Sequence, residues 1–319
     1  MEAERNFVRG EVKVKKVWSR RLFVASFLAL PMIGFFIFYI YVHLDSFCMA
    51  FQREGPGGEI LWTFDNFKTV YKALFKGEGI HGRILSVALR NTCLFYATGL
   101  LVNLPLSLLI GYFFSKKIAG YKTFRVITYM PSIIMSTALV MLFKYTFGEG
   151  GPYHASVLSG GGVYANPITK TGTAIWMMLL YTVSFGLGGN IVIWGGAMNS
   201  ISPEVLEAGK IDGCNWFQEF YLLIIPMIWP TISTVVILGA VGFLGASGPV
   251  LAFTKGEYNT YTLSYMLYEM IGQVSGSESY QNYYLASALG LCMTAISFPL
   301  AMLVKKIVYS DKKEEEEAA

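Results

Sequence analysis

Charge, cysteine and histidine are scarce in this sequence. Of its 319 residues, 14% are charged and 54% are hydrophobic, and this balance excludes an ordinary soluble domain. The four cysteines and three histidines are widely separated, and their spacing matches neither a disulfide framework nor a metal site. The phosphate loop G-x-x-x-x-G-K-S/T is also missing, which excludes ATP hydrolysis by that route. We therefore expect a membrane protein that is not an enzyme and binds no metal or other cofactor itself.

Long uncharged runs occupy most of the chain. A helix needs about 20 apolar residues to cross the hydrocarbon core of a bilayer. Six runs approach or exceed this length: 22–44, 91–114, 126–143, 172–199, 221–245 and 282–304. The sequence therefore predicts an all-α fold, a polytopic helical membrane protein with six transmembrane helices. No internal repeat is visible, so we expect residues 22–308 to form one membrane domain.

The charges between the runs indicate how the chain is oriented. Residues 1–21 form a basic tail, and the connector 115–125 after the second run is also basic. Lysine and arginine favour the cytoplasmic side of a membrane. We therefore expect both termini in the cytoplasm, with the charged tail 309–319 as a solvated, disordered end. On the outer side, the apolar spacing within residues 65–75 predicts a short interfacial helix.

The connector 200–222 is too patterned for an ordinary loop. Pro203 and Glu204 suit the first turn of a helix, and Asp212-Gly213 is a turn signal that ends it. A second short amphipathic segment follows, and Pro226 marks the entry to the fifth span. Two short helices bent at a glycine predict a knob that fits the groove of a partner protein. The alternative is a loop that only rests on lipid headgroups.

The same connector has an acidic balance, which is unusual for a cytoplasmic loop. Lys210 is outnumbered by four acidic residues: Glu204, Glu207, Asp212 and Glu219. An acidic knob suits a partner groove lined with arginine. The orientation of the chain must then depend on the other cytoplasmic segments.

The connector resembles the signature loop of permeases in binding-protein-dependent ABC importers. That signature reads E-A-A, three residues, G, nine residues, I, one residue, L-P. Its spacing is matched by Glu207-Ala208-Gly209, Gly213, Leu223, Ile225 and Pro226. Gly209 replaces the second alanine, at a cost of about 1 kcal/mol in helix propensity. Leu223 and Ile225 also depart from the signature, but none of these changes affects the bend.

The resemblance implies a type I ABC importer permease of the sugar-importing branch, in the cytoplasmic membrane of a prokaryote. Its partners would be a second permease subunit, two cytoplasmic ATP-binding subunits that carry ATP-Mg, and an extracytoplasmic solute-binding protein, with no nucleic acid. Closure of the ATP-binding subunits would drive alternating access through the loop. Glu207 would pair with a basic residue of such a subunit, and Gly213 would hold the bend. The remaining coupling residues would be Ala208, Gly209, Asp212, Trp216, Phe217, Phe220 and Pro226.

The middle of every predicted span lacks Asp, Glu, Lys and Arg. Proton-coupled carriers usually keep such a residue despite an insertion cost of roughly 2.5–3.5 kcal/mol, so the path should suit a neutral polar solute. The family branch implies an oligosaccharide. Polar groups beside aromatic faces match a sugar ring, and the candidates are Tyr181, Ser184, Asn190 and Trp194. Hydrogen bonding between helices is the alternative role for these four side chains.

Two other classes of protein are weaker hypotheses. A secondary carrier or facilitator for a neutral polar solute would work without an ATPase, and such proteins carry charged groups or inverted repeats that we do not find. A membrane-embedded enzyme would need a cluster of His, Cys or acidic residues within the spans. The sequence has no such cluster.

Overall fold

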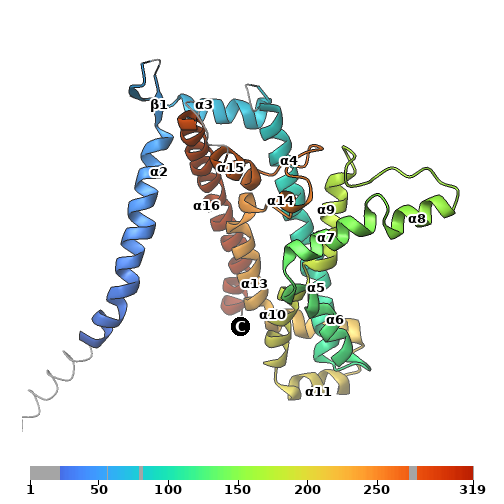
Figure 1. Ribbon diagram of the computed structural model, residues 1–319. Coiled ribbons are helices and arrows are strands. Elements are labelled where there is room, and N and C mark those ends of the chain that lie inside the picture. The colour runs from blue at the N-terminus through green and yellow to red at the C-terminus, as the bar shows by residue number, and fades with distance from the viewer. Residues whose placement is uncertain (1–21, 56, 79–81, 273–278, 319) are drawn as a thin grey trace, which may run out of the picture.

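Helices account for nearly all regular structure in this protein (Figure 1). The computed structural model describes residues 22–55, 57–78, 82–272 and 279–318, so the basic tail 1–21 lies outside the described residues. Within the described part, five helices are long and apolar enough to cross a membrane: Leu22–Ala50, Gly82–Ser115, Ala174–Asn199, Trp216–Val241 and Tyr283–Val308. They correspond to five of the six predicted runs. The prediction of an all-α, polytopic membrane protein is confirmed.

Most of these spans consist of consecutive helical segments. The segments are η1 (Phe35–Tyr41) and α2 (Val42–Ala50) in the first span; α4 (Gly82–Thr98), η3 (Gly99–Asn103) and α5 (Leu104–Ser115) in the second; α9 (Ala174–Phe185) and α10 (Gly188–Asn199) in the fourth; and α12 (Trp216–Gln218), η4 (Glu219–Ile224) and α13 (Ile225–Val241) in the fifth. The segments η1, η3 and η4 are π-helical. A π-helical turn widens a helix without ending it, so the first, second and fifth spans remain continuous through these segments.

The third predicted run forms two helices instead of one. Helix α6 (Tyr121–Ile133) and helix α7 (Ser136–Phe147) meet at a sharp bend, and α8 (Pro152–Ser159) continues from α7. The bend measures 103°, and the chain has up to six spans if the bent pair counts as one. Ile134 and Met135 have extended backbone angles, with ψ of 141° and 126°, so helical hydrogen bonding stops there. The apolar run 126–143 carried no clear signal for this break.

Short elements cover the end of the bundle that lies at the top of Figure 1. Strands β1 (Gln52–Glu54) and β2 (Ile60–Trp62) form an antiparallel hairpin with Arg53 opposite Leu61. Helix α3 (Asp65–Tyr71) and the π-helical η2 (Lys72–Lys76) follow and lie across the ends of the spans. The predicted helix over residues 65–75 is confirmed.

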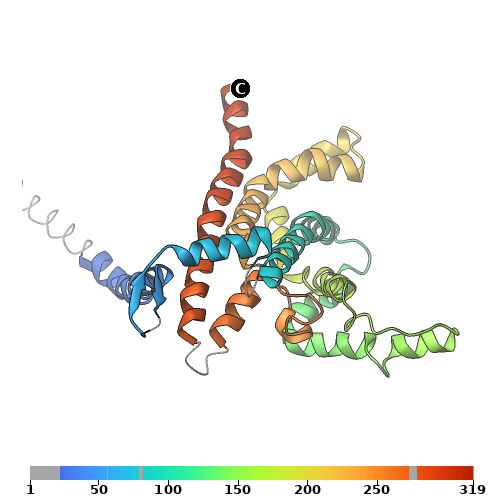
Figure 2. The same ribbon diagram turned by 90° about the horizontal axis from the view of Figure 1, so that it is seen from above.

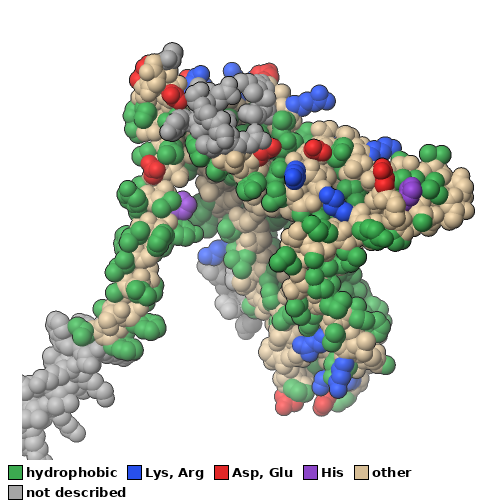
Figure 3. All heavy atoms as spheres, in the orientation of Figure 1, with side chains coloured by type: hydrophobic (Ala, Val, Ile, Leu, Met, Phe, Trp, Pro, Cys, Tyr) green, Lys and Arg blue, Asp and Glu red, His purple; other side chains and the backbone are tan. Residues whose placement is uncertain are grey.

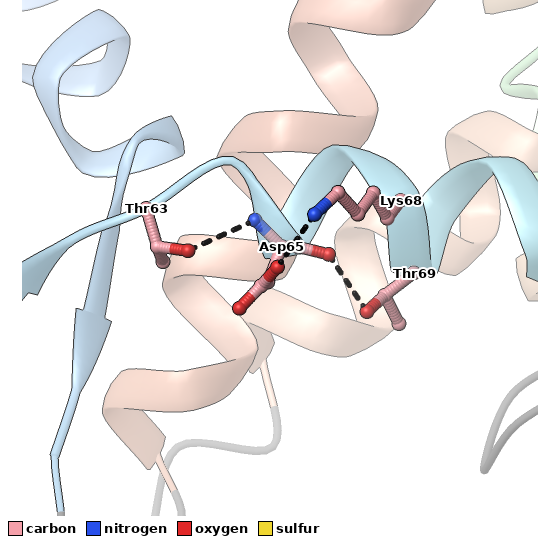
Figure 4. A network of polar contacts seen from close by, with 4 residues as sticks. All are labelled: Thr63, Asp65, Lys68 and Thr69. Atoms are coloured by element: carbon pink, nitrogen blue, oxygen red, sulfur yellow. Dashed lines mark hydrogen bonds and ion pairs between the residues drawn. The ribbon is translucent and has the colours of Figure 1, made fainter.

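Helix α3 begins with a small polar network (Figure 4). The Asp65 amide donates to Thr63 Oγ1 over 3.1 Å, and Lys68 Nζ lies 3.3 Å from Asp65 Oδ1. The Lys68 ammonium lowers the pKa of the Asp65 carboxyl, and a side-chain hydrogen bond between Thr63 and this carboxyl lowers it further. An acidic residue in the first turn also complements the helix dipole.

Three apolar clusters pack the spans together. One joins α3, α4, α15 (Leu263–Gly272) and α16 (Ser279–Ala318) around Leu85 and Leu289. The second joins α7, α9 and α14 (Val250–Phe253) around Met178. The third joins α5, α10 and the fifth span around Trp194. A short 3-10 turn, η5 (Phe243–Gly245), links the fifth span to the loop before α14.

The first span stands at the edge of the molecule. Its most hydrophobic stretch is entirely unburied, and α2 contacts the bundle chiefly through α16. Figures 1 and 2 place this span and the α7–α8 arm at opposite edges. Hydrophobic side chains cover the span and the middle of the bundle, whereas charged side chains gather toward the two ends (Figure 3). This distribution is what a bilayer requires of a spanning protein.

The last helix extends beyond the membrane-spanning stretch. Helix α16 continues to Ala318, so the backbone of the charged tail is helical. The expectation of a disordered end is therefore wrong for residues 309–318. A helix that is already formed by the last span has passed its nucleation cost and can propagate into a polar tail.

Candidate functional site

The connector 200–222 lies at the end of the bundle opposite α3, and part of it forms a separate helix across that end (Figure 1). This helix, α11, spans Pro203–Ile211 with proline in its first turn. Ser202 Oγ donates a hydrogen bond of 2.5 Å to Glu204 Oε2 at its start. The predicted helix and its starting residues are confirmed.

Gly213 makes the turn that ends α11. Its φ is +78°, in the left-handed region that glycine adopts without a steric penalty. Its amide donates to the Lys210 carbonyl over 3.1 Å, and the Cys214 amide donates to the Gly209 carbonyl over 3.0 Å. These bonds satisfy carbonyl groups that the end of a helix leaves without partners. The bend predicted at Asp212-Gly213 is present.

The segment after the turn is not a second short helix. Asn215 Oδ1 accepts from the amides of Phe217 and Gln218, and Gln218 Oε1 accepts from the Asn215 amide, which is a complete capping box. The helix that begins at Trp216 then runs without interruption to Val241. Pro226 therefore lies inside the fifth span and does not mark its start. Proline has no backbone N–H to donate to the helix, and the π-helical turn η4 directly precedes this position.

The loop presents several of its predicted coupling residues to the outside. Glu207, Ala208, Asp212 and Gly213 are exposed. The Trp216 and Phe217 side chains are 55% and 57% exposed, which is high for large aromatic groups. Phe220 is half-buried, with its ring centroid 5.2 Å from that of Tyr112 in α5. The loop thus combines an exposed acid and exposed aromatic rings on a rigid turn.

Gly209 is the one coupling residue buried in the loop itself. A Cβ atom at this position would lie 2.5 Å from Leu223 Cδ1. Glycine therefore lets α11 approach η4 more closely than alanine would. This contact gives the glycine that departs from the signature a packing function.

Glu219 does not belong to the acidic surface that the sequence predicted. It is only 5% exposed and forms an ion pair with Lys116 Nζ at the end of α5. Nearby, the Tyr112 hydroxyl donates to the Trp216 carbonyl over 3.3 Å. Lys116 and Tyr112 are partners of the loop that were not predicted from the sequence. The only signal was a basic residue at the end of the second span.

Two candidates for the transport path are tightly packed in this structure. Trp194 is fully buried, and its Nε1 donates to Ser107 Oγ over 2.8 Å, which joins α10 to α5. Tyr181 is 8% exposed, and its hydroxyl donates to the Ser136 carbonyl over 3.3 Å. Both contacts are hydrogen bonds between helices, the alternative role considered for these residues. Tyr181 in particular joins α9 to the first residue of α7, beside the bend.

The other two candidates are more accessible. Asn190 is half-buried near the start of α10, and Ser184 is exposed with its hydroxyl donating to the Leu180 carbonyl over 2.8 Å. The structure therefore separates the four candidates into two packed and two accessible residues. Their part in solute binding remains a prediction.

The glycines before Asn190 have a structural neighbour. A Cβ atom on Gly188 would lie 3.1 Å from both the Thr128 carbonyl oxygen and Ser132 Cβ, which belong to α6. Gly188 therefore permits close contact between α10 and α6, as small residues do between membrane helices. A Cβ atom on Gly189 would instead lie in open space.

Candidate metal ligands are not grouped in the part of the chain that the structure describes. No three His, Cys, Asp or Glu side chains there lie close enough to hold a metal ion. The four cysteines are all free thiols. The chemistry of the site therefore depends on neutral hydrogen-bonding groups, aromatic rings and a few paired charges.

The structure is a bundle of apolar helices with one short helix, α11, across one end. Residues 104–310 match the family described as "Binding-protein-dependent transport system inner membrane component", and the chain belongs to this family. The matched region includes the whole connector 200–222. The resemblance inferred from Glu207, Gly213 and Pro226 is confirmed.

Curated relatives of the chain are permease proteins of bacterial transport systems. It is 25% identical over 224 residues, 69% of this chain and 67% of the relative, to the arabinooligosaccharides transport system permease protein AraP of Bacillus subtilis (strain 168). It is 27% identical over 201 residues, 60% of this chain and 67% of the relative, to the lactose transport system permease protein LacF of Rhizobium radiobacter. The sn-glycerol-3-phosphate transport system permease protein UgpA of Brucella abortus biovar 1 (strain 9-941) is 22% identical over 303 residues, 93% of this chain and 100% of the relative.

The same fold occurs in a solved transporter. A chain from the crystal structure of a bacterial ABC transporter involved in the import of the acidic polysaccharide alginate aligns with a TM-score of 0.76. The sequences are 18% identical, and the alignment covers 92% of this chain and 99% of that chain. This likeness confirms the fold of an ABC importer permease.

Proposed function

We propose that this chain is the transmembrane permease subunit of an ATP-driven importer for a carbohydrate, specifically an oligosaccharide. The observation that carries the proposal is the knob formed by α11 and the Gly213 turn, which projects from the bundle with Glu207, Trp216 and Phe217 exposed. Such a knob is suited to a groove on a cytoplasmic ATPase. The chain itself has no phosphate loop, so the energy of ATP-Mg must come from a partner subunit.

The knob would receive movement from the ATPase and pass it to the spans. Glu207 would form an ion pair with a basic residue of the groove, where partial exclusion of water strengthens the attraction. Trp216 and Phe217 would bury apolar area there, as aromatic anchors do at protein interfaces. Because the helix that starts at Trp216 continues to Val241, a displacement of the knob would tilt the fifth span directly. That tilt would open the path to alternate sides of the membrane.

The solute class follows from the path and from the relatives. The central parts of the spans carry no charged side chain, and two relatives are named for arabinooligosaccharides and lactose. Another is named for sn-glycerol-3-phosphate, an anion for which a path would need compensating positive charge. A neutral oligosaccharide therefore fits this chain better. Asn190 and Ser184 would offer hydrogen bonds to its hydroxyl groups, and Tyr181 and Trp194 would contribute aromatic surface in a more open state.

The complete unit would contain a second permease, two ATP-binding subunits and an extracytoplasmic solute-binding protein. One solved relative is an alginate ABC transporter in complex with alginate pentasaccharide-bound periplasmic protein. In the cytoplasmic membrane of a prokaryote, α11 and the C-terminal end of α16 would face the cytoplasm, because both lie toward the same end of the molecule (Figure 1). The basic connector 115–125 supports that orientation.

The first experiment is to isolate the tagged chain in mild detergent and identify the proteins that accompany it. We expect an ATP-binding subunit and a second permease, whose genes would then allow reconstitution of the complex with the binding protein in liposomes. Labelled oligosaccharide should accumulate only when ATP is supplied. Transport by the chain alone without ATP would overturn the proposal and support a secondary carrier or facilitator.

Charge reversal of Glu207 tests the docking role within the same system. Glu207→Lys should reduce co-purification of the ATP-binding subunit and ATP-driven uptake by about tenfold or more, since it replaces attraction with repulsion. Glu257→Lys, an exposed acid in the loop before α15, is the matched control and should retain both. Equal uptake by the two variants would contradict the role given to Glu207.

A further inference from the structure

We infer that Lys116 is a positioning residue that fixes the second span to the loop through Glu219, so that movement of α11 also displaces α5. The inference rests on the proposed function for the source of the movement. The contact between Lys116 and Glu219 does not depend on the proposed function, so the contact and the function can be tested separately.

The Lys116–Glu219 pair is sheltered from solvent. The side chains are 24% and 7% exposed, respectively. By contrast, the ion pair between Lys68 and Asp65 is open to solvent, with side chains that are 73% and 50% exposed. An exposed pair contributes little to stability, whereas removal of one partner of a buried pair leaves an uncompensated charge and is strongly unfavourable. The sheltered pair is therefore able to hold two helices in one arrangement.

Aromatic contacts reinforce the pair over the last turns of α5. The Tyr112 hydroxyl bonds the Trp216 carbonyl, and the Tyr112 and Phe220 ring centroids are 5.2 Å apart. Lys116 Nζ lies 5.7 Å from the centroid of the Tyr112 ring. Phe113 adds a contact with Trp216, with ring centroids 6.0 Å apart. The ion pair and the aromatic rings together form a cluster that we call the α5 clamp. Its members are Tyr112, Phe113, Lys116, Trp216, Glu219 and Phe220.

The clamp lies at the loop end of the apolar cluster that joins α5 to the fifth span. Helix α11 is joined to α10 by residues 200–202 and to α12 by residues 212–215, which lie outside the helices. The helix that begins at Trp216 transmits movement to the fifth span, but no covalent connection links it to the second span. The α5 clamp adds an ion pair and aromatic contacts to the apolar packing between the two spans. Trp194 and Ser107 extend it, because they join α5 to α10.

Cys214 offers a direct measure of the clamp that needs no transport. It lies in the turn between α11 and the clamp and is partly buried. In a chain with Cys48→Ala, Cys93→Ala and Cys292→Ala, maleimide modification would report this thiol alone. We expect Lys116→Glu and Glu219→Lys each to accelerate the modification about tenfold, because local opening exposes the turn. The double exchange of both residues should return the rate to within about threefold of the parent, since the pair is restored in reverse.

The second measurement uses the reconstituted complex and gives the number of solute molecules imported per ATP hydrolysed. Both rates are normalised to the amount of assembled complex. A residue that only stabilises the fold would reduce the amount of complex and leave this ratio unchanged. We expect each single charge reversal to lower the ratio about tenfold and the double exchange to restore most of it. Lys68→Glu breaks the exposed pair and is the matched control, with no change in either measurement.

Glu219→Gln keeps the experiment decisive if a charge reversal prevents folding. It retains the size of the side chain and removes its charge, and it should raise the Cys214 rate and lower the import ratio by smaller factors. The inference is overturned if neither single reversal nor Glu219→Gln changes the Cys214 rate, or if the double exchange fails to restore it. If the parent complex shows no ATP-dependent import, the proposed function fails, while the Cys214 rates still decide whether the clamp exists.

Discussion

Gly209 and Leu223 meet where α11 crosses the beginning of the fifth span, and a methyl group at position 209 would require the end of the Leu223 side chain to move. A Cβ atom on Gly209 would lie 2.5 Å from Leu223 Cδ1. The two residues depart together from the signature of the family, which has alanine at the first position and isoleucine at the second. The close approach of the two helices is thus a property of this pair.

Gly209→Ala should destabilise the loop even though alanine favours helices. The gain of about 1 kcal/mol in helix propensity is offset by overpacking against Leu223, which costs about 1–3 kcal/mol. We expect a lower midpoint in thermal unfolding of the purified chain, followed by tryptophan fluorescence. Gly209→Ala combined with Leu223→Ala removes the overlap and should recover part of the loss. A single variant that is more stable than the parent would contradict this explanation.

Gly213→Val should abolish ATP-driven uptake while the protein still reaches the membrane. The φ of +78° at this turn is costly for a β-branched residue, and the strain is of order 1–3 kcal/mol. The bend between α11 and the fifth span would then change direction. Gly213→Asn is the matched control, because asparagine tolerates this region, and it should keep most of the activity. Normal uptake by the valine variant would remove the role assigned to the bend.

Ser107→Ala should lower the stability of the purified chain. It leaves the buried Trp194 Nε1 without an acceptor, at a cost of about 0.6–2 kcal/mol within a membrane protein. Thermal unfolding in detergent measures this loss. Trp194→Phe with Ser107→Ala removes both partners and should cost less than the sum of the single changes. Unchanged stability of the Ser107→Ala variant would contradict the structural role given to this bond.

Asn190→Leu should weaken solute recognition with little effect on folding. The side chain is half-buried, and loss of its hydrogen bonds to a neutral solute should raise the KM of uptake about tenfold, the factor that corresponds to about 1.4 kcal/mol. Asn199→Leu, at the exposed end of the same helix, serves as the control. Equal KM values for both variants and the parent would exclude Asn190 from the path.

Local properties of the sequence determined most of the spans, the start and end of α11, and the family to which the chain belongs. Span length depends on uninterrupted apolar residues, so five of the six predicted runs appear as long helices. The start of α11 at Pro203 and the turn at Gly213 follow from the backbone preferences of proline and glycine. The spacing from Glu207 to Pro226 was enough to indicate the family, which the match over residues 104–310 confirms.

Only the tertiary structure decided how these pieces contact one another. Glu219 looked like part of an acidic surface until packing placed it against Lys116, and the bond between Trp194 and Ser107 was not indicated by the sequence. The bend after Ile133 and the helix that continues through Pro226 were likewise evident only in the structure. In lipid, helices associate through close packing and polar bonds instead of a hydrophobic pattern. Pairs that are distant in sequence therefore leave no periodic signal, and the fold alone brings them together.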